Sequence, residues 1–280
     1  MPVAFVGRLS LDFFGNMLVN KLAKNGVQTD LIKRSDQTTT LAFVKLEENK
    51  EPQYAFYVEG CADRSLSASD LPASLPKDAR CILFGSISMT MEPIATTIEN
   101  FVKKEAAKQA KDALVISLDP NVRPVMISDR ASYVKRLESW IACATILKIS
   151  GADLEFIYPE LSRDAALKKV GAMGPTLVVT TLGRDGAIAY GRRADLSSFS
   201  ATAPIVDVPV VDTIGAGDTF HAGFLSYLEM NGKMSREALA NLTEAELSAA
   251  LFFANKAASL VCSKRGAEPP TLAEMEAFGK

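Results

Sequence analysis

Histidine and closely spaced cysteines are scarce in this sequence, and their scarcity excludes several kinds of site. Its four cysteines, Cys61, Cys81, Cys143 and Cys262, lie far apart, without the Cys-x-x-Cys spacing of zinc sites and redox motifs. The one histidine, His221, cannot form a cluster of metal-binding imidazoles. We therefore expect neither a zinc site nor a disulfide framework, and the reducing cytoplasm is the expected location.

A charge excess of either sign is also lacking, because 31 Lys and Arg stand against 33 Asp and Glu, giving a net charge of −2. Proteins that bind nucleic acid or membrane surfaces use a positive field that this composition does not supply. No segment reaches the ~18 consecutive apolar residues of a membrane span, and no signal peptide is recognisable at the N-terminus. We expect a small-molecule partner, and neither nucleic acid nor membrane.

What the sequence does contain is a large supply of apolar residues, 48% of 280, arranged in alternating patterns. Such a chain can bury a large core, so a single domain over residues 1–280 is expected. Short β-branched runs alternate with helical periods, which predicts an α/β fold whose mostly parallel sheet is covered by helices on both faces. The predicted strands are 3–6, 81–85, 114–119, 145–150 and 176–181, and the predicted helices are 12–24, 92–110 and 129–143, with short helices after 150.

Two further strand-like runs interrupt this alternation. LAFVKL (41–46) and YAFYV (54–58) flank the polar stretch EENKEPQ. This pattern predicts an antiparallel hairpin near 41–58 that forms a small β flap, or lid, off the main sheet.

The stretch VVDTIGAGDTFHAGFL (210–225) is the clearest functional signal. Gly215-Ala216-Gly217 precede a helical period that begins at Phe220, so the glycines lie at a helix N-terminus, where free amides and the helix dipole attract an anion. The alternative is a tight turn in which Asp218 caps the first helical turn. Both interpretations of this motif remain open at this point.

Two common anion-binding motifs do not match this stretch. A Walker A loop needs Lys-Ser/Thr where Asp218 and Thr219 stand, and a dinucleotide fingerprint needs glycine or alanine in place of Phe220. What remains is an anion site that carries its own carboxylate. In phosphoryl transfer, such an aspartate can accept the proton of an attacking hydroxyl while backbone amides stabilise the transferred group.

The sequence DTIGAGD at 212–218 resembles the C-terminal signature of the ribokinase-like (PfkB) carbohydrate kinase family. Other segments resemble the family in the family's order, namely FVGRLSLDFFGNML, TTTLAFV, FYVEGCAD, LFGS, LDPNVRP, TLGRDGA and CSKRGA. Within the family, bacterial fructokinases are the most similar group, and 2-keto-3-deoxygluconate kinases come next. The resemblance implies a ribokinase-like fold and an ATP-dependent sugar kinase with fructose as the favoured acceptor.

The resemblance also implies roles for the motif. Asp218 would be the catalytic base that contacts the sugar hydroxyl, and the amides of Gly215, Ala216 and Gly217 would bind the transferred phosphoryl group. Asp212 resembles the family's ligand for a monovalent cation, which would be K⁺.

Three residues are predicted on the sugar side besides Asp218. Asn121 and Arg123 follow a buried parallel strand, at the end where open α/β sheets bind ligands. Arg123 would clamp phosphate oxygens or a sugar hydroxyl; its alternative is a surface arginine in a Pro-bounded turn. Tyr57 on the flap would touch the sugar, or would only cover the apolar face of the hairpin.

On the nucleotide side, the resemblance implies a set of contacts from several segments: Lys148, Thr181, Gly183, Gly186, Gly217 and Asn255. Asn255 on the last long helix would lie near adenine, and its alternative is a solvated helix residue. His221 is expected to be a packing or surface residue, because Asp218 already supplies the base.

The sequence departs from the family at two places. Ser150-Gly151-Ala152-Asp153 stands where the family's Asn-x-x-Glu, linked to Mg²⁺, would be, so Asp153 would supply a carboxylate of shorter reach. The strand aspartate and the Gly-Gly-x-x-x-Asn motif of the sugar site are not found, which implies a start about 40 to 50 residues late and an exposed strand edge.

Two classes of function follow from these observations. The leading hypothesis is an ATP-dependent sugar kinase with Mg²⁺ on the phosphates, for which the sequence allows a homodimer. Its variants are a 2-keto-3-deoxygluconate kinase or another sugar or nucleoside kinase. The other class is a catalytically impaired homologue that binds nucleotide. Without the N-terminal motifs, the chain is expected to bind ATP measurably and to phosphorylate fructose poorly.

Overall fold

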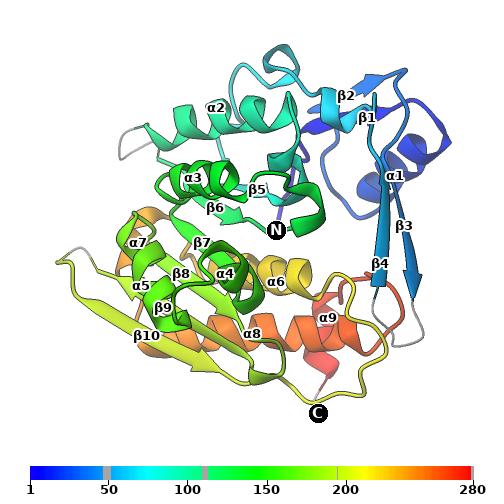
Figure 1. The fold of residues 1–280 in the computed structure, drawn as a ribbon. Coiled ribbons are helices and arrows are strands. Elements are labelled where there is room, and N and C mark those ends of the chain that lie inside the picture. Colours follow the sequence, from blue (N-terminus) through cyan, green and yellow to red (C-terminus); the bar gives the residue numbers. More distant parts are fainter. Residues whose placement is uncertain (47–51, 109–112, 194, 279–280) are drawn as a thin grey trace. The chain divides into compact units, whose positions relative to one another are not determined.

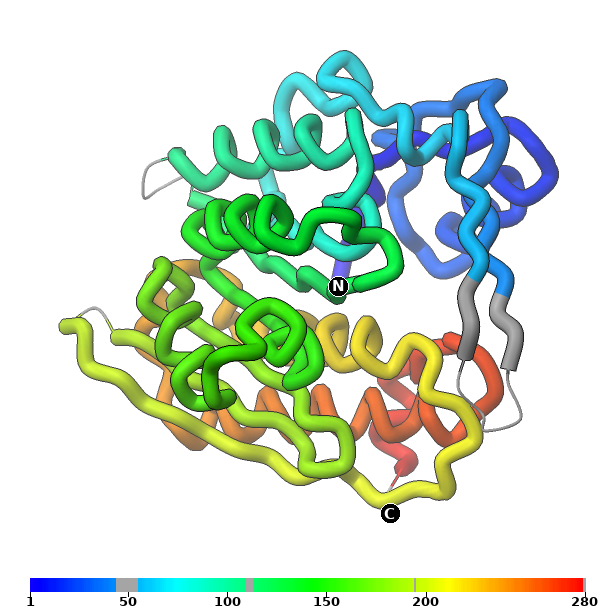
Figure 2. The backbone as a smooth tube through the Cα atoms, in the orientation of Figure 1, coloured from blue at the N-terminus to red at the C-terminus, as the bar shows by residue number. Residues whose placement is uncertain are grey.

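The computed structural model describes residues 1–46, 52–108, 113–193 and 195–278, which form two compact units (Figures 1 and 2). The first unit comprises Met1–Asp78 and Ile87–Phe101, and the second comprises Ala79–Ser86 and Val102–Lys280. Helix α2 (Ile94–Ala106) includes residues of both units. The expected single domain over residues 1–280 stays a prediction, and each unit is described by itself.

The second unit contains a six-stranded sheet in the order β10-β9-β8-β7-β6-β5. Strands β5 to β8 run parallel to one another, and β9 and β10 continue the sheet in antiparallel pairing. The strands are β5 Cys81–Gly85, β6 Val115–Asp119, β7 Ile146–Ser150, β8 Leu177–Thr181, β9 Ala187–Arg192 and β10 Ser198–Ala203. The predicted mostly parallel α/β sheet is confirmed, and its four predicted strands begin within one residue of the observed ones.

Helices cover both faces of this sheet (Figure 1). Helix α8 packs on β9, β10 and α6, whereas α4 and α5 pack on β7 and β8. The helices of this unit after α2 are α3 Arg130–Ile141, α4 Gly151–Ile157, α5 Arg163–Ala172, α6 Ala216–Met230, α7 Arg236–Ala240, α8 Glu244–Cys262 and α9 Leu272–Ala277.

The side-chain alternation of the strands decides what faces α6 and α8. Val115 on β6 and Ile146 on β7 belong to the buried cluster that contains the apolar residues of α6 and α8. Successive side chains of a strand point to opposite faces, so Ser117 and Asp119 share the face of Val115, and Lys148 shares the face of Ile146. Three polar side chains are therefore directed toward α6.

The first unit contains two small sheets. β1 (Gly7–Ser10) pairs in parallel with β2 (Ile32–Ser35), and β3 (Leu41–Leu46) pairs antiparallel with β4 (Pro52–Tyr57). The predicted hairpin is confirmed, although the first five residues of its polar stretch, 47–51, lie outside the described residues. The strand predicted at residues 3–6 is wrong. That run contributes one isolated bridge, and the strand begins at Gly7, because pairing with β2 starts there.

The helix predicted from Asp12 is confirmed as α1 (Phe13–Lys24). Its N-cap carboxylate accepts a hydrogen bond from the Gly15 amide at 2.7 Å. Its apolar face, however, is not buried. Phe14 is 41% exposed, Met17 51% and Leu18 41% in the described part of the chain, because α1 packs mainly along β1. The helical period identified the element without identifying a buried neighbour for it.

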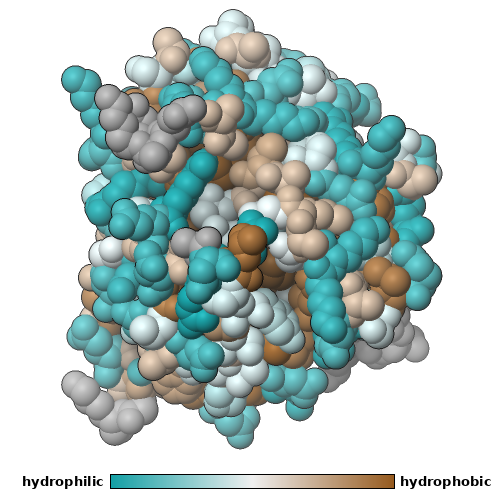
Figure 3. Space-filling view, turned by 90° about the vertical axis from the view of Figure 1, so that its left-hand side faces the viewer, coloured by the Kyte–Doolittle hydropathy of each residue, from teal (hydrophilic) through white to brown (hydrophobic). Residues whose placement is uncertain are grey.

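One helix of the described chain, α8, is long and apolar enough to cross a membrane by length and composition alone. Half of that stretch is buried inside the structure, as in the core helix of a soluble protein, so the test is weak evidence for a span. Figure 3 shows one face of the molecule, where hydrophilic residues surround small, separate hydrophobic groups.

The contact between α6 and α8 leads to a stability prediction. Leu228, which is 0% exposed on α6, belongs to the cluster that joins the two helices and the sheet. We expect Leu228→Ala to lower the free energy of unfolding by ~2–5 kcal/mol, because it leaves a cavity in this core. Met230→Ala on the same helix, where the side chain is 51% exposed, should cost less than ~0.5 kcal/mol. Urea unfolding of both variants checks this, and equal losses would contradict it.

Candidate active site

Helix α6 begins in a way that only glycine allows. Its N-cap Gly215 has φ +78°, in the left-handed region, and a Cβ there would lie 2.9 Å from the Ala267 side chain. Among the described residues, nothing accepts a hydrogen bond from the amides of Gly215, Gly217 and Asp218, whereas the Ala216 amide donates to the Thr213 carbonyl at 3.2 Å. The unengaged amides form the kind of helix N-terminus that binds anions.

This arrangement revises the composition of the predicted anion site. Ala216, expected to donate its amide to the phosphoryl group, already has a carbonyl acceptor, and its role stays a prediction. The amide of Asp218 is an additional donor that the sequence analysis missed. Counting positions from an N-cap at Gly215 would have found it, because the amides of the first helical turn have no acceptor within the helix.

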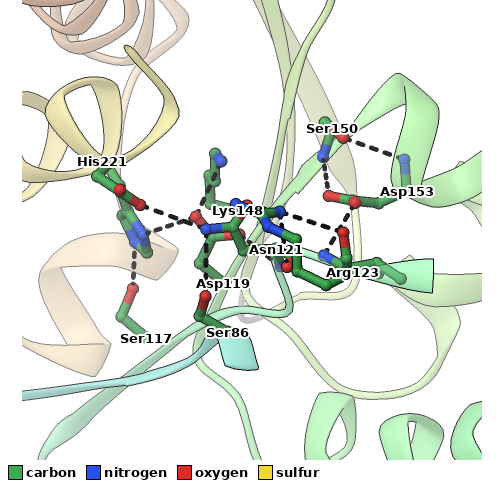
Figure 4. Close-up of polar contacts among 11 residues, drawn as sticks. Ser86, Ser117, Asp119, Asn121, Arg123, Lys148, Ser150, Asp153 and His221 are labelled. Carbon is green, nitrogen blue, oxygen red and sulfur yellow. Dashed lines mark hydrogen bonds and ion pairs between the residues drawn. The ribbon is translucent and has the colours of Figure 1, made fainter. Parts of the chain in front are cut away.

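Asp218 lies exposed in the first turn of α6, next to the carboxyl ends of β5 and β6. The Asn121 side-chain amide approaches its carboxylate at 3.5 Å and donates to Ser86 at 3.3 Å. The Asn121 backbone amide donates to Asp119 at 3.0 Å, which anchors the residue (Figure 4). Ser86 and Asn121 have φ +61° and +40°, strained values that concentrate at functional sites.

Arg123 bends back onto its own loop. Its guanidinium donates to the Asn121 carbonyl at 3.0 Å, to the Asn121 side-chain oxygen at 2.7 Å and to the Val122 carbonyl at 3.1 Å (Figure 4). These bonds fix the direction in which the Asn121 amide points. Arg123 is therefore more than the surface arginine of the alternative interpretation, because it organises its own loop. The predicted contact of Arg123 with phosphate or sugar stays a prediction.

Lys148 forms a buried ion pair with Asp119, with Nζ and Oδ2 2.9 Å apart and exposures of 4% and 7%. A Cβ built on Gly217 would lie 3.2 Å from the Lys148 ammonium nitrogen. Glycine at 217 therefore leaves room for the ammonium beside the first turn of α6. Burial alone would raise the pKa of the Asp119 carboxyl, but the nearby His221 imidazole and the charge of Lys148 hold it below its ordinary value.

His221 is buried, at 2% exposure, so of the two expected roles the packing residue fits and the surface residue does not. Its Nε2 lies 2.7 Å from the Ser117 hydroxyl, and its Nδ1 lies 3.8 Å from Asp119 (Figure 4). It does more than fill space, because a buried imidazole with two polar neighbours has defined hydrogen-bond roles. Two sequence signals could have revealed this: polar residues at alternate positions of the apolar strand LVISLD, and the three-residue spacing from Asp218.

Asp153 uses both carboxylate oxygens within its own neighbourhood. Oδ1 accepts from the Val122 amide at 3.0 Å, and Oδ2 accepts from the Ser150 amide at 3.1 Å, which completes a capping box on α4. Burial raises the pKa of this carboxyl, although the Ser150 hydrogen bonds oppose the shift. No group of three or more His, Cys, Asp or Glu among the described residues could hold a metal ion. The described residues around Asp153 therefore do not form a Mg²⁺ site made by protein ligands alone. The predicted contact of Asp153 with Mg²⁺ stays a prediction.

Asp212 joins two loops of the second unit. Its carboxylate accepts from the Ile214 amide and from the Gly266 amide, both at 3.0 Å. These hydrogen bonds hold the pKa of the Asp212 carboxyl below its ordinary value. The residue therefore stays ionised at neutral pH at the entry to the α6 N-terminus, as a cation ligand would, and K⁺ binding itself stays a prediction.

Four of the residues predicted to bind the nucleotide lie at the end of β8, in the turn that follows it and on α8. Thr181 ends β8, and Gly183 follows at φ +59° with open space where a Cβ would be. Gly186, at φ +84°, packs so closely that a Cβ would lie 2.2 Å from the Ala203 carbonyl. Asn255 is only 4% exposed and donates to the Ala203 and Pro204 carbonyls at 2.9 Å, so the alternative of a solvated residue is wrong. Contact with nucleotide stays a prediction for all four.

Tyr57, the remaining predicted residue, belongs to the first unit. It is 63% exposed and packs edge-to-face on Phe43, with ring centroids 5.6 Å apart. The pair presents an aromatic surface on one face of the hairpin, and contact with sugar stays a prediction.

A cavity of about 360 Å³ lies at the other end of the sheet, where Thr145 and Thr176 precede β7 and β8. In open α/β sheets, ligands bind outside the carboxyl ends of the strands. The cavity therefore lies at the wrong end of the sheet for the site at Asp218.

The second unit thus brings together an exposed carboxylate, unengaged helix amides and a buried lysine at the carboxyl end of a parallel sheet. Such a set can accept a proton from a hydroxyl while it stabilises negative charge on a phosphoryl group. The class of protein that these features define is a phosphotransferase of the open α/β type.

Comparisons with known proteins agree with this class. Residues 1–274 match the pfkB family carbohydrate kinase domain. The chain is 36% identical over 247 residues to a fructokinase of Rhizobium leguminosarum bv. trifolii, covering 88% of this chain and 72% of that protein. It is 33% identical over 282 residues to the probable fructokinase-5 of Arabidopsis thaliana, covering 99% and 82%. The chain therefore belongs to the pfkB family of carbohydrate kinases.

Solved structures support the fold. A fructokinase from Xylella fastidiosa with bound ATP superposes with a TM-score of 0.85 at 26% identity, covering 98% of this chain and 84% of that one. A double mutant of a Vibrio cholerae fructokinase, in a form with fructose, ADP and a potassium ion, superposes with a TM-score of 0.82 at 25% identity, covering 99% and 84%. The predicted ribokinase-like fold is confirmed.

The close approach of Lys148 to Gly217 predicts opposite effects of two similar substitutions. Gly217→Ala should destabilise the protein by ~1–2 kcal/mol, because the methyl group pushes a buried ammonium away from Asp119. Gly171→Ala on α5, where a Cβ would meet Val178 at an ordinary 4.0 Å, should instead stabilise by ~0.5–1 kcal/mol through helix propensity. Urea unfolding measures the stability of both variants. If both substitutions stabilise the protein, the Lys148 side chain moves aside at little cost, and the prediction for Gly217→Ala is wrong.

Proposed function

We propose that this chain is an ATP-dependent fructokinase that transfers the γ-phosphoryl group of ATP to a hydroxyl of fructose. The observation that carries the proposal is the exposed Asp218 carboxylate beside unengaged amides at the N-terminus of α6. The similarity to proteins named fructokinase supports fructose as the acceptor, and the neighbour with bound ATP supports the donor.

In the proposed reaction, the sugar oxygen attacks the γ-phosphorus of ATP, and the bond from that phosphorus to the β,γ-bridging oxygen breaks. ADP leaves, and the hydroxyl proton passes to the Asp218 carboxylate. The Asn121 amide, 3.5 Å from this carboxylate, holds it toward the acceptor. A carboxylate suffices as the base if the proton leaves late in a loose transition state.

The negative charge of the transferred group is proposed to lie against the amides of Gly217 and Asp218. The Lys148 ammonium lies beside Gly217 and adds a positive charge at the same place. Charge stabilisation by groups that are already in position is the largest contribution in many enzymes. Lys148 is thus proposed to act on the phosphoryl side of the site.

Three further assignments complete the proposal. Mg²⁺ would be held mainly by the ATP phosphates, as is usual for this ion, and would neutralise charge on them. K⁺ would bind near Asp212, as supported by the potassium ion in the Vibrio cholerae structure. The balanced net charge of −2 supports small-molecule partners, the widely spaced cysteines support a cytoplasmic setting, and a homodimer is one assembly that the sequence allows.

The role of the carboxylate is tested by Asp218→Asn, which keeps the size of the side chain but removes the proton acceptor. We expect kcat to fall at least ~100-fold while ATP affinity stays nearly unchanged. Glu237→Gln is the matched control, because Glu237 is also an exposed carboxylate in the first turn of a helix, α7. A coupled ADP assay and calorimetric ATP titration measure the two quantities.

The same assay separates the two classes of function. Full activity of Asp218→Asn would remove Asp218 as the base. Tight ATP binding without fructose-dependent ADP release in the wild type would favour the catalytically impaired homologue.

The cation assignment predicts that activity rises and saturates as K⁺ replaces tetramethylammonium at constant ionic strength. The ion would order the loop between Asp212 and Gly217, which leads directly into the amides of α6. Asp212→Asn should respond much less, whereas Asp129→Asn, at the N-cap of α3, should respond as the wild type does. Identical rates in the two salts would exclude a monovalent-cation site.

A further inference from the structure

The polar groups behind Asp218 form a buried chain, and the proposed reaction gives a role only to its last member, Lys148. Ser117 and Asp119 lie two residues apart on β6 and face α6, where His221 stands between them. The Ser117 hydroxyl contacts Nε2 at 2.7 Å, and Asp119 lies 3.8 Å from Nδ1 (Figure 4). Asp119 in turn holds Lys148 at 2.9 Å.

The order Ser-His-Asp is also that of a nucleophilic triad, but burial excludes this function here. Ser117 is 0% exposed, and His221 is 2% exposed. A nucleophile must reach a substrate carbonyl or phosphorus, and this hydroxyl is enclosed by the sheet and α6. We therefore look for the effect of Ser117, His221 and Asp119 at the other end of the chain, which is the Lys148 ammonium.

The two neighbours of the imidazole favour one tautomer. A carboxylate only accepts, so Nδ1 is attracted to Asp119 when it carries the proton. Nε2 then has a free lone pair and accepts from the Ser117 hydroxyl. Both contacts are satisfied in this tautomer, and the other one would place the Nδ1 lone pair opposite the Asp119 carboxylate.

We propose that His221 is a positioning residue: anchored by Ser117, it holds the Asp119 carboxylate in place, and through it the Lys148 ammonium beside Gly217. The inference rests on the proposed function only in that the charge of the buried Lys148 then acts on the transferred phosphoryl group from behind Gly217. His221 itself does not touch substrate. Its place on α6, one turn after Asp218, ties the lysine to the same helix that supplies the amides and the base.

Three substitutions separate positioning from packing. His221→Phe removes both polar contacts and keeps a ring in the space. His221→Asn keeps an N–H donor near the position of Nδ1 and so restores the contact with Asp119. Leu225→Met, a buried volume-conserving change on the same helix, controls for packing of α6.

For His221→Phe we expect kcat to fall about tenfold, the upper end of the cost of one lost neutral hydrogen bond, here the one with Ser117, with an unchanged KM for fructose. His221→Asn should recover most of this loss, and Leu225→Met should behave as the wild type. The preference for a non-hydrolysable ATP analogue over ADP, measured by calorimetry, should shrink several-fold in His221→Phe. Ser117→Ala serves as a milder variant if His221→Phe does not fold, since it removes the anchor of Nε2 and should lower the same preference.

A spectroscopic test is direct because His221 is the sole histidine of the sequence. Nitrogen-15 spectra of the full chain contain one imidazole, and we expect a protonated Nδ1 and an unprotonated Nε2. In Ser117→Ala, the Nδ1–H tautomer should persist, because the Asp119 carboxylate still disfavours a lone pair at Nδ1.

The inference is overturned if the wild type shows the Nε2–H tautomer. It is also overturned if His221→Phe keeps both its kcat and its nucleotide preference, or if His221→Asn is no better than His221→Phe. Failure of the proposed function would look different: no variant, the wild type included, would phosphorylate fructose. In that case the nucleotide preference and the imidazole spectrum would still decide the role of His221.

Discussion

The ion pair between Asp119 and Lys148 is the interaction on which the arrangement of the site depends. Both partners are almost fully buried, so removing either would leave an uncompensated charge in the core, at a cost of several kcal/mol. The pair joins the carboxyl end of β6 to β7 and brings a positive charge against α6. The same carboxylate also binds the Asn121 amide, so the strained loop that faces Asp218 starts from this one buried group.

The sheet could be predicted well from the sequence because its signals are local. Apolar runs such as TLVVTT indicate strands buried on both faces, and those strands begin within one residue of the prediction. The helix N-terminus at Gly215 was predictable for the same reason, since the glycines and the helical period stand side by side. The run at residues 3–6 shows the limit, because β-branched residues make a strand only where a partner pairs with them.

The polar chain behind the site was not predictable, because it joins residues about a hundred positions apart. The alternate polar residues of LVISLD and the spacing of His221 from Asp218 each mark one side of the contact, but only the packing of β6 against α6 brings Ser117 and His221 together. The roles of Asn255 and Asp153 were hidden in the same way. The sequence shows an amide and a carboxylate, and the fold decides that both are occupied by backbone groups.

The apolar face of α1 has a consequence for the behaviour of the protein in solution. Its exposed phenylalanine, methionine and leucine side chains order water that would be released on contact with any other apolar surface. Salts that strengthen such contacts, sulfate above all, should therefore salt the protein out early, whereas chloride should be tolerated. With a net charge of only −2, electrostatic repulsion between molecules opposes this association weakly. One helix, far along the sequence from the DTIGAGD motif, thus contributes to the colloidal stability of the chain.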